Sequence, residues 1–226
     1  YNVNIAGLYE FCLDVTDSTN TDACEPACVE VIVIPDEAIH VELTWTTAGD
    51  TEIEADEGIE GNGSDMDLHF AHPFSTGAAN PDIDGDGSPD PWYNDPFDCF
   101  FLNKAPNWGS FAPDANDDPS LDRDDFDGWG PENLNLNIPE DGASYQIGVH
   151  YWNHWGYGDS LATIRVYVYG ELDVEVVDVP MKNHDMWYVG EIPWVAGTGT
   201  TTVFTNEDGS YRITPQYSNP SFQPPF

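Results

Sequence analysis

Basic residues are scarce in this sequence. Among 226 residues there are 5 Lys and Arg against 42 Asp and Glu, which gives a formal net charge of −37 at pH 7. The basic residues stand singly, at Lys104, Arg123, Arg165, Lys182 and Arg212. Proteins that bind nucleic acid or anionic membrane surfaces use clustered Lys and Arg, so this distribution argues against both kinds of partner.

Long hydrophobic runs are missing as well. No apolar run reaches the roughly 18 residues of a membrane-spanning helix, so we expect no membrane insertion. The start, YNVNIAGLYE, lacks an initiator Met and the charge pattern of a signal peptide, which indicates a mature fragment of a longer chain. Aromatic residues, at 13%, are too frequent for a disordered acidic tail. A folded protein of this charge needs saline surroundings or bound cations to relieve its self-repulsion.

Cysteine is limited to four residues, Cys12, Cys24, Cys28 and Cys99, and no pair has the C-x-x-C spacing. An even number is typical of up to two disulfides in an oxidising compartment. We expect one bond within the group Cys12, Cys24 and Cys28, with the connectivity left open. An extracellular or cell-surface location follows from this expectation.

Catalytic motifs are absent too. The sequence contains neither H-E-x-x-H nor G-x-S-x-G. A zinc hydrolase built on His69 and His72, or on His150 and His154, is the alternative, but His69 and His72 face opposite sides of a regular strand. We therefore expect no enzyme activity.

Alternation with a period of two residues runs through the chain, and no stretch has the pattern of an amphipathic helix. Strands are predicted at 40–45, 133–138 and 145–151, with Val41, Leu43, Trp45, Leu134, Leu136 and Ile138 pointing inward. Residues 163–170 and 172–179 read as a hairpin around Gly170 and Glu171. The expected fold is all-β: an antiparallel β-sandwich, jelly-roll or immunoglobulin-like, with long calcium-binding loops and an N-terminal β-hairpin.

Composition divides the chain into three parts. Residues 1–35 hold two strand candidates, residues 36–193 form the main calcium-binding sandwich domain, and residues 194–226 are a Thr-, Pro- and Gly-rich tail with one hairpin around NEDGS. The first part resembles the last two strands of a PKD (polycystic kidney disease) repeat, on Gly7, Tyr9, Phe11, Leu13, Val15 and Asp17. The resemblance implies an extracellular setting and a sheet completed by a longer chain, a second domain or a neighbouring molecule.

The stretch DIDGDGSPD, residues 82–90, predicts a calcium loop. With Asp82 at loop position 1, the side chains of Asp84, Asp86 and Asp90 and the carbonyl of Ser88 fall at ligand positions. Tyr93 stands where a bidentate Glu is expected, so Asp95 or Asp98 would have to supply the missing carboxylate. No Lys or Arg lies nearby in the sequence to neutralise these residues.

A second calcium site is predicted from two acidic segments. On a strand, Asp65 and Asp67 share one face, and the segment 117–133 adds a dense acidic bend. The candidate ligands are Asp65, Asp67, Asp122, Asp124, Asp127 and Glu132. The alternative for both sites is a solvated or halophilic acidic surface.

The same segments resemble an uncharacterised family of secreted bacterial β-sandwich domains. The resemblance rests on Asp65, Asp67, Leu68 and His69, on Leu121, Asp122, Asp124, Asp127, Gly128, Gly130, Pro131, Glu132 and Asn133, and on Tyr145, Val149, His150 and Tyr151. It implies an extracellular or periplasmic protein without established catalytic activity.

Aromatic residues offer a further interpretation. Trp152, Trp155 and Tyr157 stand among glycines, and Trp92 and Tyr93 follow the first acidic loop. Exposed rings beside calcium loops are typical of sugar binding, whereas rings packed under long loops form satellite cores. The sequence therefore predicts a non-catalytic, calcium-stabilised structural or adhesive module of a bacterial surface protein or filament, which contacts other copies or other domains. The alternative is a calcium-dependent carbohydrate-binding domain with glycan partners.

Overall fold

The computed structural model describes residues 6–16, 18–19, 26–50, 63–75, 81–110, 116–125 and 128–218. Within these residues the secondary structure consists of strands without a helix, and every pair of strands is antiparallel. The all-β prediction is confirmed. This part of the chain consequently offers no helix of the length and hydropathy that crossing a membrane requires.

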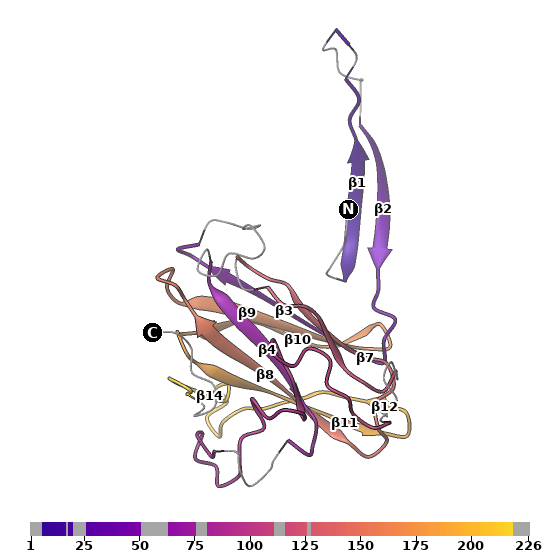
Figure 1. Ribbon diagram of the computed structural model, residues 1–226. Coiled ribbons are helices and arrows are strands. Elements are labelled where there is room, and N and C mark those ends of the chain that lie inside the picture. Colours follow the sequence, from indigo (N-terminus) through magenta and orange to yellow (C-terminus); the bar gives the residue numbers. More distant parts are fainter. Residues whose placement is uncertain are drawn as a thin grey trace.

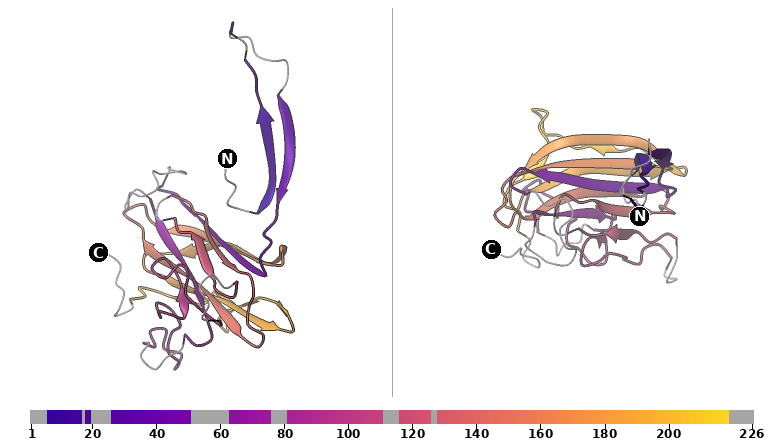
Figure 2. Two further views of the ribbon diagram at one scale, coloured as in Figure 1. Left: turned by 45° about the vertical axis from the view of Figure 1, so that its right-hand side comes forward. Right: turned by 90° about the horizontal axis from the view of Figure 1, so that it is seen from above.

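Two sheets face one another, as Figures 1 and 2 show, consistent with a sandwich. The five-stranded sheet has the order β10 (Glu171–Met181), β9 (Ser160–Val168), β3 (Ile39–Thr47), β7 (Glu132–Leu136) and β6 (Ser120–Arg123). The seven-stranded sheet has the order β12 (Thr198–Gly199), β11 (Met186–Val195), β8 (Ser144–Asn153), β4 (Asp65–Ala71) and β5 (Asp98–Cys99), and β13 (Thr202–Val203) and β14 (Ile213–Thr214) also pair with β11.

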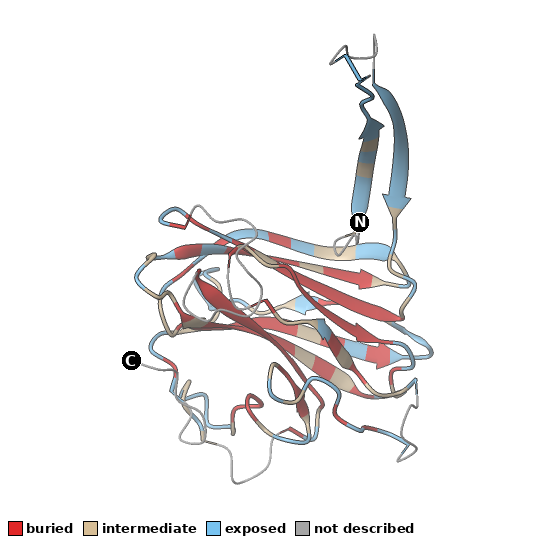
Figure 3. Cartoon of the chain, turned by 45° about the horizontal axis from the view of Figure 1, so that its top comes forward, coloured by how far each residue is buried: buried red, intermediate tan, exposed pale blue. Residues whose placement is uncertain are grey.

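The main core lies between the sheets. Alternate residues of β3, namely Val41, Leu43 and Trp45, pack there against residues such as Leu68 of β4 and Val149 of β8. Figure 3 shows the buried positions concentrated on the strands of the two facing sheets. The period-two pattern therefore predicted these strands, and the inward face of β3, correctly, because strand geometry is local.

Two details of the prediction are wrong. Ile138 is 57% exposed, because β7 ends at Leu136 and the chain bends before Ile138. The β9–β10 turn consists of Tyr169 and Gly170, and Glu171 already pairs with Val168. Both turn residues have positive φ, 49° and 77°, as the common two-residue hairpin turn requires.

A second aromatic core covers the outer face of the seven-stranded sheet. It contains Trp92, Tyr93 and Phe100 from the long connection between β4 and β6, together with Tyr188 of β11 and Tyr217. As a result β4 is buried on both faces, although its sequence alternates between polar and apolar residues. This cover places three polar side chains of β4, Asp65, Asp67 and His69, in the interior of the protein.

Trp92 and Met186 pack closely against Gly148, so a single methyl group added at Gly148 should destabilise the fold. A Cβ added at Gly148 would lie 2.8 Å from Cη2 of Trp92 and 3.0 Å from Cε of Met186. We expect Gly148→Ala to lower the free energy of unfolding by about 1–3 kcal/mol, since overpacking forces neighbours to move. Urea unfolding of Gly148→Ala, of Trp92→Leu and of the double variant checks this. The two costs should add to more than the cost of the double variant; simple additivity would contradict the contact.

The C-terminal segment belongs to the seven-stranded sheet as far as β14, since β12, β13 and β14 all pair with β11. The expected boundary after residue 193 falls inside β11. A turn at residues 206–210 is closed by the hydrogen bond from the Asn206 N–H to the Ser210 carbonyl, which places a reversal where NEDGS predicted one.

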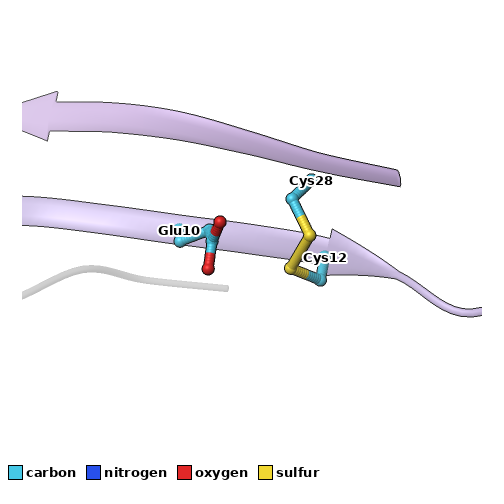
Figure 4. A group of neighbouring side chains, drawn as sticks. All are labelled: Glu10, Cys12 and Cys28. Carbon is cyan, nitrogen blue, oxygen red and sulfur yellow. A yellow bond between two sulfur atoms is a disulfide. The ribbon is translucent and has the colours of Figure 1, made fainter. Parts of the chain in front are cut away.

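Strands β1 (Gly7–Leu13) and β2 (Ala27–Val33) form a two-stranded ribbon that projects from the sandwich (Figure 1). Cys12 and Cys28 are directly opposite and form a disulfide (Figure 4), which confirms a bond within the predicted group. Cys24 and part of the connection between the strands lie outside the described residues. Including Cys99 among the disulfide residues is wrong: Cys99 is a buried free thiol on β5, and burial raises its pKa well above the usual range.

Candidate metal centre

Three carboxylates lie close together, one on β4 and two at the ends of the connection between β6 and β7. Asp67 lies on β4, Asp124 follows β6, and Glu132 is the first residue of β7. One carboxylate oxygen of each lies within 4.8 Å of the others. We call this group the carboxylate centre. It joins the two sheets, because β4 belongs to the seven-stranded sheet and β7 to the five-stranded sheet.

The position of Glu132 follows from the short β5. That strand pairs only with Phe70 and Ala71, so it does not cover the edge of β4 at Leu68. The Glu132 carboxylate lies there instead: its Oε2 accepts a hydrogen bond of 2.6 Å from the Leu68 N–H. Its Oε1 accepts a second bond, of 3.3 Å, from the Asp125 N–H. Glu132 thereby satisfies backbone donors from two elements and has no exposed surface.

Asp67 has an unsatisfied oxygen. The residue is 4% exposed, and its Oδ2 is buried without a hydrogen-bond partner. A buried carboxylate oxygen without a donor or a cation is costly, because it has lost its hydration. This atom is the strongest local indication that the carboxylate centre takes a positively charged ligand.

The electrostatic environment also favours a positively charged ligand at the carboxylate centre. Burial, followed by the charges of Asp65 and Asp124, raises the pKa of Asp67 well above its usual range. Burial and the charge of Asp67 likewise raise the pKa of Glu132 well above its usual range. Lys104 compensates in part: its Nζ donates a hydrogen bond of 2.7 Å to Asp124 Oδ2. When all four groups are ionised, three carboxylates and one ammonium group leave the centre with an excess of two negative charges.

The structure separates the predicted ligands of this site. It brings together Asp67, Asp124 and Glu132, and Asp65 is buried nearby on the same strand face. Asp122 is turned elsewhere, since its oxygens accept hydrogen bonds from Ser120 Oγ and Asn135 Nδ2. Asp127 lies outside the described residues. Lys104 was missed, because a single Lys within a long connection has no pattern that indicates its neighbour in space.

The first acidic loop has a different environment. Oxygens of Asp82, Asp84 and Asp86 lie within 4.8 Å of one another on the surface. Asp82 accepts hydrogen bonds of 2.8 Å from the Gly85 N–H and 3.1 Å from the Gly87 N–H, which hold the loop in a tight bend. The other predicted ligands hold the loop as well: the Ser88 N–H donates to Asp86, and Asp90 accepts from the Ile83 N–H.

A basic residue does neutralise this loop, although no Lys or Arg lies near the loop in the sequence. Arg212 Nη2 donates hydrogen bonds to Asp84 and Asp86, and its guanidinium lies 4.9 Å from the centre of the Tyr188 ring. Asp98 does not complete the loop, because its Oδ2 accepts hydrogen bonds of 2.7 Å from His69 Nδ1 and from the Tyr93 N–H in the interior.

The Arg212 contact predicts a change in titration. Its hydrogen bond lowers the pKa of Asp86, so the contact stabilises the folded state above the ordinary carboxyl pKa, and that contribution is lost as the pH falls through the lowered value. Because Asp86 is exposed, its pair with Arg212 contributes only about 0–1 kcal/mol, and Arg212→Gln should raise the Asp86 pKa toward its usual value. Carboxyl NMR titration measures this. An unchanged Asp86 pKa would show that the contact does not form in solution.

The aromatic candidates are not uniformly exposed. Trp152, Trp155 and Tyr157 are half-buried, and the Trp152 ring centre lies 5.4 Å from that of Phe101. Trp92 and Tyr93 are buried in the second core, as the satellite-core interpretation predicts.

The histidines considered for zinc also have other partners. His69 contacts Asp98, His150 Nδ1 lies 2.5 Å from Tyr93 Oη, and His154 Nδ1 accepts a hydrogen bond from the Gly156 N–H. His72 Nε2 lies 3.3 Å from a carboxylate oxygen of Glu140. Among the described residues, no group placed to hold a metal includes a histidine.

The remaining group near sulfur is not a metal site, since the cysteines beside Glu10 are joined in the disulfide (Figure 4). Comparison with known proteins adds no assignment: no family model, no curated protein and no solved structure matches this chain.

Proposed function

We propose that this protein is a non-catalytic, extracellular module with a structural or adhesive role, whose fold is stabilised by calcium at the carboxylate centre. The unpartnered, buried Oδ2 of Asp67 carries the proposal. Calcium prefers oxygen ligands in flexible geometry and takes six to eight of them. Asp67, Asp124 and Glu132 would supply the carboxylates, and water or backbone carbonyls would supply the rest.

The expected role of the cation follows from the elements that it joins. Bound at the centre, calcium would connect β4, β7 and the segment that leads out of β6. It would also balance the buried negative charge that otherwise raises the pKa of both Asp67 and Glu132. The acidic loop at Asp82, Asp84 and Asp86 is the weaker site of the proposal, because calcium has to compete there with Arg212. For that loop we expect a dissociation constant on the order of 10⁻⁴ to 10⁻³ M.

The ribbon supports the proposed contact with other domains or other copies. Its residues Leu8, Leu13, Val29 and Ile32 are all more than half exposed. A lone two-stranded ribbon is marginal in water, and Leu8 and Ile32, which are directly opposite in the strand register, give one of its faces an exposed apolar pair that a partner would cover. We do not adopt the carbohydrate-binding alternative, since Trp152 already packs against Phe101 and His150.

Thermal and urea unfolding in calcium, in magnesium and in excess chelator test the proposal. If calcium binds only the folded state, a roughly 1,000-fold excess over the dissociation constant should add about 4 kcal/mol to the free energy of unfolding. Sodium chloride at matched ionic strength is the control, because general screening of the charge of −37 would respond to any salt. Equal stability in calcium and in chelator would contradict the proposal.

A further inference from the structure

A groove of about 310 Å³ lies at the base of the ribbon, and its lining includes none of the three residues of the carboxylate centre. Its walls are Ala6, the segment 33–37 that connects β2 to β3, and the outer faces of β3, β6 and β7. Four carboxylates line it, from Asp36, Glu37, Glu42 and Asp122. The basic side chains in the lining are those of His40 and Arg123, and Arg123 donates to Asp125.

Glu42 is the unusual residue of this groove. It lies in the middle of β3, on the face opposite the main core, and nevertheless has no exposed surface. Its Oε1 accepts a hydrogen bond of 2.5 Å from the Ala6 N–H and lies 3.4 Å from His40 Nε2. Its Oε2 is buried without a hydrogen-bond partner. The Ala6 N–H therefore engages one oxygen of the carboxylate, while Tyr167 of β9 lies close enough for burial and the Glu42 charge to raise the Tyr167 pKa.

The nearest arginine in the sheet does not meet this need. Arg165 of β9 is directly opposite Glu42 in the strand register, yet its Nε donates a hydrogen bond of 2.8 Å to Glu175 of β10. Adjacent strands place paired side chains on the same face, so an ion pair between Arg165 and Glu42 would be the ordinary arrangement. The Glu42 carboxylate, which lines the groove, is therefore left without an arginine partner.

We propose that this groove binds the ammonium group of a lysine side chain presented by a partner protein. A single unpaired carboxylate oxygen suits a compact ammonium group, which is a point charge with three donors. A guanidinium would need both oxygens for its planar fork, and Oε1 is already engaged by Ala6.

Other acceptors and the walls fit the same ligand. Both oxygens of Asp122 accept hydrogen bonds from Ser120 and Asn135, so its charge can attract a cation without offering a free carboxylate to a metal. Among the described residues, no set of three metal-binding side chains converges in the groove. Val33, Ile34 and Pro35 provide an apolar wall along which the methylene stem of a lysine can lie.

The test is a titration of the full chain, in saturating calcium, with Nα-acetyl-lysine methylamide. Nα-acetyl-norleucine methylamide, which lacks the charge, is the matched probe. We expect the lysine probe to bind and the norleucine probe to bind at least about tenfold more weakly, as a charged hydrogen bond predicts. Glu42→Gln should weaken the lysine probe by a similar factor, whereas Glu207→Gln, in the exposed turn at residues 206–210, should leave it unchanged. Equal binding of the two probes, or no effect of Glu42→Gln, would overturn the proposal.

Amide chemical shifts of the unmodified protein keep the test decisive if Glu42→Gln does not fold. Shifts caused by the lysine probe should fall on Ala6, Glu42 and residues 33–37, and shifts confined to other regions would overturn the site. Displacement of the probe by further calcium would reassign the groove to inorganic cations. If n-butylammonium binds as tightly as the lysine probe, the groove recognises an ammonium group alone, and the proposal that a partner protein presents it is overturned.

Discussion

Asp67→Asn should abolish the stabilisation by calcium and leave the calcium-free protein as stable as the parent, or more stable. The reason is that the side chain has opposite effects in the two states. Without a cation, Asp67 is a buried carboxylate near Asp65 and Asp124, and its Oδ2 has no partner. With a cation, the same charge becomes a ligand. Asparagine keeps the shape and removes the charge, so it relieves the repulsion and weakens the site.

Urea unfolding of the parent and the variant, each in chelator and in calcium, measures this reversal. At a roughly 1,000-fold excess of calcium over the parent's dissociation constant, the variant should lose about 4 kcal/mol of ligand-dependent stability. Asp82→Asn is the matched control, because it removes a carboxylate from the surface loop and leaves the carboxylate centre intact. A variant that stays fully calcium-dependent would exclude Asp67 as a ligand. A large loss of stability in chelator would show that the Asp67 charge has a different partner.

The second large effect is on the pH dependence of stability. In chelator, the parent protein should become less stable as the pH rises from about 4 toward 8. The pKa values of Asp67 and Glu132 are raised in the folded state, so folding favours their protonated forms. The folded protein then binds more protons than the unfolded chain, and its free energy of unfolding falls as the pH rises through the raised values. Each pKa unit of difference corresponds to about 1.4 kcal/mol.

Calcium should reverse this slope, because the cation binds the deprotonated carboxylates. The double variant Asp67→Asn/Glu132→Gln is the control, and its slope in chelator should be flatter than that of the parent. Burial lowers the pKa of His150 in the folded state, so this residue makes the protein less stable as the pH falls, opposite to the effect of Asp67 and Glu132. The His150 contribution is the same in the parent and the double variant and cancels in the comparison. Identical slopes for parent and double variant would contradict the raised pKa values.

The strands of the core show which features of the fold could be predicted from alternation in the sequence. Alternation in the segments 40–45 and 145–151 predicted both strands and the inward face of the first, because side-chain direction on a strand depends only on neighbouring residues. It could not predict that the polar face of β4 is buried as well. That burial depends on Trp92, Tyr93 and Phe100, which pack over β4 from a connection without a regular repeat.

For the candidate ligands, too, some properties could be predicted from the sequence and others could not. The sequence indicated that Asp65 and Asp67 share a strand face, and that an acidic bend precedes β7. It offered no means to choose among the acids of that bend. Glu132 lies at the centre because β5 is short and the edge of β4 at Leu68 needs an acceptor, whereas Asp122 is held by Ser120 and Asn135.

By itself, then, the sequence determined an all-β protein, a large negative charge that requires compensation, and a short set of acidic segments where cations could bind. Only the tertiary structure decided which charges meet. Arg212 neutralises Asp84 from 128 residues away, and Glu132 reaches Leu68 across 64 residues and between two sheets. Such contacts depend on strand order and on the path of long connections, and a Coulomb interaction depends on distance in space and not along the chain.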